Sequence, residues 1–148
     1  HYGIAGGGVY DWALYDSHYT ERYMDTPQNN PEGYSISRVL NYVEGYPTDY
    51  TSNVISSEAS SRPSVFSSEA SSRVEKSVLP VMLKLTHGTG DDNVHHQNTL
   101  QLLDALHRHG KRFDFMIYPD GMHGYRGYQG THFQNANNAF WLQYLKNE

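Results

Sequence analysis

The chain has 148 residues, enough for one compact domain, and a formal net charge of −5. This acidic balance argues against nucleic acids and anionic membranes as partners, because both are bound through basic patches. The longest apolar run, at 78–83, is too short to span a membrane, and no signal-peptide pattern opens the sequence. The absence of cysteine excludes disulfides, thiolate nucleophiles and cysteine-bound zinc. We therefore predict one soluble domain, or a piece of one.

The N-terminal region predicts a strand followed by an aromatic-rich segment. Residues 1–9 are small and apolar around three consecutive glycines, which is typical of a short buried strand that ends in a tight backbone passage. Trp12, Tyr15 and Tyr19 stand at helical spacing, so one face of a short helix or turn could carry all three rings. The stretch 27–34 then favours turns throughout.

A Ser-rich region interrupts this pattern. The segment VISSEASSR at 54–62 recurs at 65–73 as VFSSEASSR. Two copies are too few to bury a shared core, and Ser-rich sequence with few large apolar groups is typical of a mobile loop or linker. We therefore predict a flexible insert over 47–78, with an ordered surface helix as the alternative.

The C-terminal region predicts a strand, a helix, a second strand and a second helix. The apolar stretch 79–86 is predicted as a buried strand, and alternating apolar residues predict another over 113–118. Between them Gly110 can end a helix with a leucine stripe, formed by Leu100, Leu103 and Leu106 with Leu102 on the flank. Apolar residues from 133 to 145 predict an amphipathic C-terminal helix. Strands and helices that alternate in this way favour parallel pairing, so we predict half of an α/β sheet.

Titratable residues follow both strands of this C-terminal region. Asp91 and Asp92 come after the first strand, and His123 comes after the second. Because the carboxyl ends of parallel strands share one edge of the sheet, an Asp on one loop can orient a His on the next and fix its tautomer. The alternative is that Asp92 or Asn93 caps the following helix while His123 is an ordinary turn residue.

Three longer motifs resemble one enzyme family. In chain order they are WALYDSHYTERYMDTPQNNPEGY, HGTGDDNVHHQNT and YPDGMHG. They resemble the C-terminal part of serine peptidases of the prolyl oligopeptidase family, and above all its dipeptidyl peptidase IV branch. The resemblance covers roughly 1–45 and 79–148, which is nearly everything except the Ser-rich insert. It implies that 1–148 is a partial peptidase catalytic domain, the C-terminal half of an α/β-hydrolase fold.

The resemblance also implies a role for individual residues. Asp91 would be the acid of a catalytic triad, and His123 its general base and then general acid. Asn93 would donate an amide N–H to a backbone carbonyl of the substrate. The pocket for the residue that precedes the scissile bond would be lined by Val9, Trp12, Tyr15 and Tyr19. A cup of flat rings suits proline or alanine, so the implied partner is a peptide with Pro or Ala as its second residue, unless the rings are simply core packing.

The serine nucleophile of the family is not found in these residues. Its Gly-x-Ser-x-Gly elbow does not occur in 1–148. Since the family order is Ser, Asp, His, we expect that serine upstream of the first predicted strand, and we expect this chain by itself to be inactive. One alternative is a non-catalytic remnant or interaction module that uses an exposed sheet edge to form a homodimer or to bind a complementing N-terminal portion. Another, a carbohydrate binder, rests on tyrosine content alone.

No cofactor and no metal site are expected. The nine histidines lack the i, i+4 pair with Glu that is typical of helical zinc motifs. His107 and His109, near the predicted C-terminus of a helix, instead suit the helix dipole. The family resemblance favours a periplasmic or secreted location, whereas the residues by themselves leave the compartment open.

Overall fold

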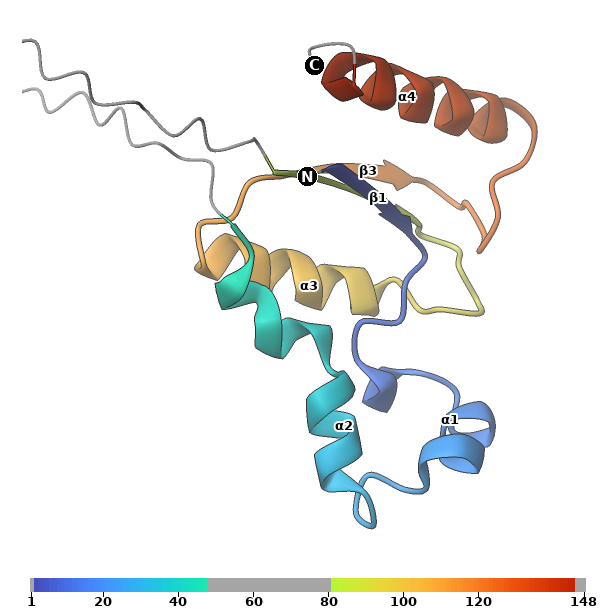
Figure 1. Ribbon diagram of the computed structural model, residues 1–148. Coiled ribbons are helices and arrows are strands. Elements are labelled where there is room, and N and C mark those ends of the chain that lie inside the picture. Colours follow the sequence, from blue (N-terminus) through green and yellow to red (C-terminus); the bar gives the residue numbers. More distant parts are fainter. Residues whose placement is uncertain (1, 48–80, 146–148) are drawn as a thin grey trace, which may run out of the picture.

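The computed structural model describes residues 2–47 and 81–145, which form a parallel sheet with helices on both faces (Figure 1). The Ser-rich insert predicted over 47–78 lies, except for position 47, outside the described residues. No helix in the two described ranges is both long enough and apolar enough to cross a membrane.

Three parallel strands make up the described sheet, in the order β1-β2-β3: β1 (Tyr2–Gly6), β2 (Met82–Gly88) and β3 (Phe113–Tyr118). The central strand, β2, is buried along almost its whole length, as expected of a parallel strand that is covered on both faces. Leu85 lies at its middle and pairs with Ala5 on one side and Phe115 on the other. The predicted α/β class is confirmed. Of the predicted strand 79–86, the first two residues lie outside the described part of the chain.

Helix α3 (Gln97–Arg108) covers one face of the sheet. Its buried stripe consists of Asn98, Thr99, Leu102, Leu103 and Leu106. The predicted stripe was wrong in one respect, because Leu100 is 50% exposed while Leu102, placed on the flank, is buried against Leu85. Both sets of leucines have helical spacing, and only the position of the sheet decides which of them faces inward.

The end of α3 follows the prediction at Gly110. This glycine has a φ of +59°, a left-handed conformation that a side chain would strain. Its N–H donates to the carbonyl of His107 at 3.0 Å, and the N–H of Lys111 donates to that of Leu106 at 2.9 Å. This pair of bonds is a Schellman motif, and it turns the chain from α3 towards β3.

Helix α4 (Gly127–Leu145) lies on the opposite face of the sheet (Figure 1). The predicted C-terminal helix is confirmed, but it begins at Gly127 and buries only Phe140 completely. Tyr144 stacks on Tyr2 of β1 with ring centroids 4.9 Å apart. Leu145, predicted on the buried face, is exposed, because three described strands cover only a narrow stripe of this helix.

Short helices occupy the segment between β1 and residue 47: η1 (Trp12–Leu14), α1 (Ser17–Met24), α2 (Pro31–Ser37) and η2 (Val39–Gly45). The prediction of one short helix or turn face for all three aromatic residues was wrong. The Asp11 side chain caps η1 and the Asp16 side chain caps α1, so Tyr15 falls between two separate helices. Of these helices, η2 packs against α3.

Because only one face of α3 is buried, substitutions of two of its leucines should affect the free energy of unfolding differently. We expect Leu106→Ala to lower the free energy of unfolding by about 2–5 kcal/mol, because its side chain is 2% exposed and packs in the core. Leu100→Ala, at a half-exposed position, should change it by no more than about 0.5 kcal/mol. Urea denaturation followed by circular dichroism measures both, and equal losses would contradict the assigned face.

Candidate active site

Two loops at the carboxyl edge of the sheet bring Asp91 and His123 together. Asp91 follows β2 and His123 follows β3. The ring Nδ1 of His123 lies 3.0 Å from Oδ2 of Asp91, whose side chain is fully buried, whereas that of His123 is 46% exposed. A buried carboxylate thus holds one ring nitrogen and leaves Nε2 for proton transfer. The two loops therefore bring the Asp91 and His123 side chains into direct contact.

Backbone groups hold the carboxylate of Asp91. Its Oδ1 accepts hydrogen bonds from the N–H groups of Asn93 at 3.1 Å and Val94 at 2.9 Å. Burial raises the pKa of Asp91, but the Val94 N–H, the His123 ring and the Asn93 N–H outweigh it and lower this pKa below its ordinary value. Asp91 is therefore ionised at neutral pH.

The capping alternative for this loop was wrong. The N-cap of α3 is His96, which makes no capping hydrogen bond through its side chain, so neither Asp92 nor Asn93 caps this helix. The bonds that Asp91 makes to the two N–H groups ahead of it close the loop instead. The described residues contain no cluster of three or more His, Asp or Glu side chains that could hold a metal ion.

Glycines let the backbone approach this pair closely. Gly7, directly after β1, has a φ of +55°, and a Cβ there would lie 3.2 Å from the His123 ring and 3.5 Å from Oδ2 of Asp91. A Cβ on Gly88, at the end of β2, would collide with the backbone carbonyl of Gly121. From the sequence we predicted only a tight backbone passage at the three glycines. Because they follow a strand at its carboxyl end, their position could have indicated that they lie beside the site.

The three predicted aromatic residues form one cluster beside the site. The Tyr15 ring meets Trp12 and Tyr19 edge-on, with centroids 5.8 and 5.6 Å away, and the Trp12 and Tyr19 rings stack at 6.3 Å. Trp12 and Tyr15 are half-buried and Tyr19 is 50% exposed. None of them belongs to the buried core of the described residues, so the core-packing alternative was wrong.

Asn93 connects this cluster to the Asp91 loop. The hydroxyl of Tyr15 donates to Oδ1 of Asn93 at 2.8 Å, which leaves the Asn93 Nδ2 group as a donor. Tyr15, Tyr19 and Asn93 all line one open cavity of about 580 Å³. Trp12 lines an adjoining hollow with Tyr19, and Val9, half-buried on the loop after β1, lines neither.

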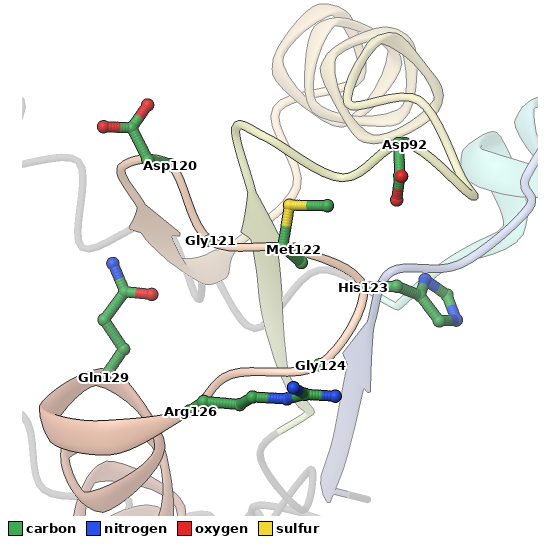
Figure 2. A pocket seen from close by; sticks show the side chains of 8 residues that line it. All are labelled: Asp92, Asp120, Gly121, Met122, His123, Gly124, Arg126 and Gln129. Atoms are coloured by element: carbon green, nitrogen blue, oxygen red, sulfur yellow. The ribbon is translucent and has the colours of Figure 1, made fainter.

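A second open cavity, of about 470 Å³, adjoins His123 (Figure 2). Asp92 and His123 stand at one end of it, and Asp120 and Gln129 stand at the other. Asp92, next to Asp91 in the chain, lines both this cavity and the aromatic cavity.

Residues 1–148 all match the sequence profile of the prolyl oligopeptidase family. The chain belongs to the prolyl oligopeptidase family. A protein of Coccidioides posadasii (strain C735) named "Probable dipeptidyl-aminopeptidase B" is 41% identical over 137 residues, which span 92% of this chain and 11% of that protein. A protein of the same name from Neurospora crassa is 39% identical over 137 residues, with the same two shares.

Solved structures agree with this family assignment. The dipeptidyl peptidase 4 of Porphyromonas gingivalis has a TM-score of 0.71 and 30% identity, over 97% of this chain and 16% of that one. A dipeptidyl aminopeptidase IV homologue from Bacteroides ovatus has the same TM-score and shares at 27% identity. Within the prolyl oligopeptidase family, these matches place the chain in the dipeptidyl peptidase IV branch. The chain spans between about a tenth and a sixth of the length of these relatives.

Proposed function

We propose that this chain is the C-terminal part of the catalytic domain of a serine peptidase that releases N-terminal dipeptides after Pro or Ala. The observation that carries the proposal is the 3.0 Å hydrogen bond between Nδ1 of His123 and the buried carboxylate of Asp91. This bond fixes the tautomer in which Nε2 can accept a proton, and the carboxylate stabilises the imidazolium that then forms. Membership of the family supports the reaction type.

The proposed reaction is acyl transfer. A serine from a Gly-x-Ser-x-Gly elbow, a motif that 1–148 do not contain, attacks the carbonyl carbon of the second substrate residue. His123 takes the serine proton and gives it to the leaving amine, which departs with its electron pair. Water then attacks the acyl ester, again through His123, and releases the dipeptide and the serine. Asp91 stays ionised throughout and orients His123.

The aromatic cluster would select the residue before the scissile bond. The side chain of a proline or alanine would contact the rings of Trp12, Tyr15 and Tyr19, with Val9 proposed as a further wall. The free Nδ2 of Asn93 would donate to a backbone carbonyl of the substrate, because the Tyr15 hydroxyl already occupies the amide oxygen.

The sheet edge supports the second candidate function, an interaction module. In the described part of the chain β1 pairs only with β2, so its other side can pair with one more strand. That strand would come from a second copy of this chain or from an N-terminal portion of the same domain. Light scattering at micromolar concentration distinguishes these states, and a well-folded monomer would count against the homodimer.

A graft tests the proposed peptidase function. Residues 1–148 replace the matching segment of the Porphyromonas gingivalis dipeptidyl peptidase 4, and the product is called the grafted enzyme. We expect it to cleave glycyl-prolyl and alanyl-prolyl reporters. A folded but inactive grafted enzyme would contradict the proposal.

The chain by itself should behave differently from the grafted enzyme. We expect no turnover of either reporter and no covalent labelling by a serine-directed phosphonate, because catalysis by an acid–base pair without its nucleophile is largely lost. Mass spectrometry detects the label. A modified serine within 1–148 would show that the nucleophile has been placed wrongly.

A further inference from the structure

A second histidine lies behind the acid–base pair, with no role in the reaction described so far. His87 is in β2, four residues before Asp91, and its side chain is fully buried. Its Nε2 lies 2.8 Å from the carbonyl oxygen of Val94 and 3.2 Å from Oδ2 of Asp91. Its Nδ1 lies 2.6 Å from the hydroxyl of Thr99. Both ring nitrogens therefore have close polar partners.

These contacts select one tautomer of His87. Nε2 faces a carbonyl and a carboxylate, which only accept hydrogen bonds, so Nε2 carries the proton. Nδ1 faces the Thr99 hydroxyl, which donates to it when that nitrogen is unprotonated. The neutral Nε2–H form satisfies both ring nitrogens, because Nε2–H donates to the Val94 carbonyl and Nδ1 accepts from Thr99. Thr99 is itself fully buried in the first turn of α3, so the helix holds the ring in place.

The His87 ring borders the donors that hold Asp91. Oδ1 of Asp91 accepts two backbone N–H groups and Oδ2 accepts the Nδ1–H of His123 at 3.0 Å, while Nε2 of His87, which donates to the Val94 carbonyl, lies 3.2 Å from the same Oδ2. Val94 contacts both residues, because its N–H donates to Asp91 and its carbonyl accepts from His87. A fully buried carboxylate needs such donors to stay ionised, and their directions fix its orientation.

We propose that His87, as a neutral Nε2–H donor to the Val94 carbonyl with Thr99 at its Nδ1, is a positioning residue. It fixes the Val94 backbone, whose N–H holds the Asp91 carboxylate in the orientation in which Asp91 holds His123. The hydrogen-bond network is a property of this chain, and only its catalytic consequence rests on the proposed function.

Two titratable side chains lie close to His87, those of His96 and Asp91. The nearest other titratable ring is His96, whose centroid is 5.2 Å away and which stacks on Phe115 of β3. Burial, and to a lesser degree the neighbouring His87, lowers the pKa of His96, so this second ring is neutral at physiological pH. Asp91 is then the charged group that contacts His87.

Two substitutions separate the donor from the bulk of the ring. His87→Gln keeps an N–H donor near the position of Nε2, and His87→Leu keeps comparable bulk without a donor. His96→Phe is the matched control, since it alters a ring beside His87 that forms no hydrogen bond or ion pair with Asp91 in the described part of the chain. Nuclear magnetic resonance of this chain reads out the tautomer of each imidazole, the Nδ1–H proton of His123 and the titration of the Asp91 carboxyl carbon.

We expect wild-type His87 to be in the Nε2–H form. In His87→Leu the Val94 carbonyl loses its donor, so the Val94 N–H should hold the ionised Asp91 less well. The pKa of Asp91 should then rise, with proton affinity up by about tenfold, and the His123 Nδ1–H proton should exchange with water about tenfold faster. His87→Gln and His96→Phe should stay near the wild type. In the grafted enzyme, His87→Leu should lower kcat by about 10–100-fold with KM unchanged, and His87→Gln should restore most of it.

Several results would overturn the inference. The inference is wrong if His87 is in the Nδ1–H tautomer. It is also wrong if the Asp91 and His123 signals are unchanged in His87→Leu. Both results count whether or not the grafted enzyme is active. An intact network in an inactive grafted enzyme refutes the proposed function alone. If His87→Leu does not fold, Thr99→Val and Thr99→Ser decide instead. Thr99→Val removes the hydroxyl that donates to Nδ1, so it should move the Nδ1 nitrogen signal of His87 and speed the exchange of the His123 Nδ1–H proton, whereas Thr99→Ser should do neither. Identical spectra for the two variants would contradict the proposal.

Discussion

Asp91→Asn in the grafted enzyme is expected to lower kcat by about 10⁴-fold while the domain still folds. One oxygen of this carboxylate accepts two backbone N–H groups and the other accepts the ring N–H of His123. An amide has only one acceptor oxygen, so in either orientation its NH₂ group faces donors or donates to Nδ1. In the second case His123 is held in the tautomer whose Nε2 carries a proton and cannot act as a base.

The control for this substitution is Asp104→Asn on α3. Asp104 forms an exposed ion pair with Arg108 and lines neither of the two cavities beside the site, so its loss should leave kcat within about twofold. Reporter hydrolysis measures both variants, and thermal unfolding confirms that each is folded. If Asp91→Asn retained more than about a tenth of the activity, the carboxylate would not be the orienting group.

Gly88→Ala is expected to impair both activity and stability. A methyl group at Gly88 would collide with the backbone carbonyl of Gly121, in the turn that leads to His123. The turn has to move, and a displacement of about 1 Å of an acid–base group costs on the order of 100-fold in rate. The same strain should lower the free energy of unfolding by about 1–3 kcal/mol.

The matched control lies on the same turn. A Cβ on Gly124 meets nothing within 4 Å, and its backbone is outside the left-handed region, so Gly124→Ala should resemble the wild type. Steady-state kinetics of the grafted enzyme and urea denaturation of this chain measure the two effects separately. If Gly88→Ala and Gly124→Ala had the same kinetics and the same stability, the contact between β2 and the turn at Gly121 would not position His123.

Local patterns in the sequence predicted much of the fold. Apolar runs and turn residues predicted β2, β3, α3 and α4, because a strand or helix that buries one face must repeat apolar residues at its own period. The same patterns predicted that Asp91 and His123 share one edge of the sheet, since both follow parallel strands. The hydrogen bond between them follows that logic.

The spacing of residues did not predict the structure correctly where the sequence fits two arrangements equally well. Leu100 and Leu102 both continue a helical stripe, and only the sheet beneath α3 decides that Leu102 is buried. Trp12 and Tyr19 suited one helix, but the capping by Asp11 and Asp16 divides the segment into two. A cap stops a helix through one side-chain hydrogen bond, which the spacing of aromatic residues does not reveal.

The sequence by itself determined two properties of this chain. Its periodic patterns determined the fold class, and its motifs determined the family. The tertiary structure alone decided which groups touch the acid–base pair. Gly7 approaches His123 from the other end of the chain, Tyr15 reaches Asn93, and His87 lies beneath Asp91 with Thr99 behind it. Such contacts depend on how loops from separate strands pack together, and no period or spacing within one segment encodes them.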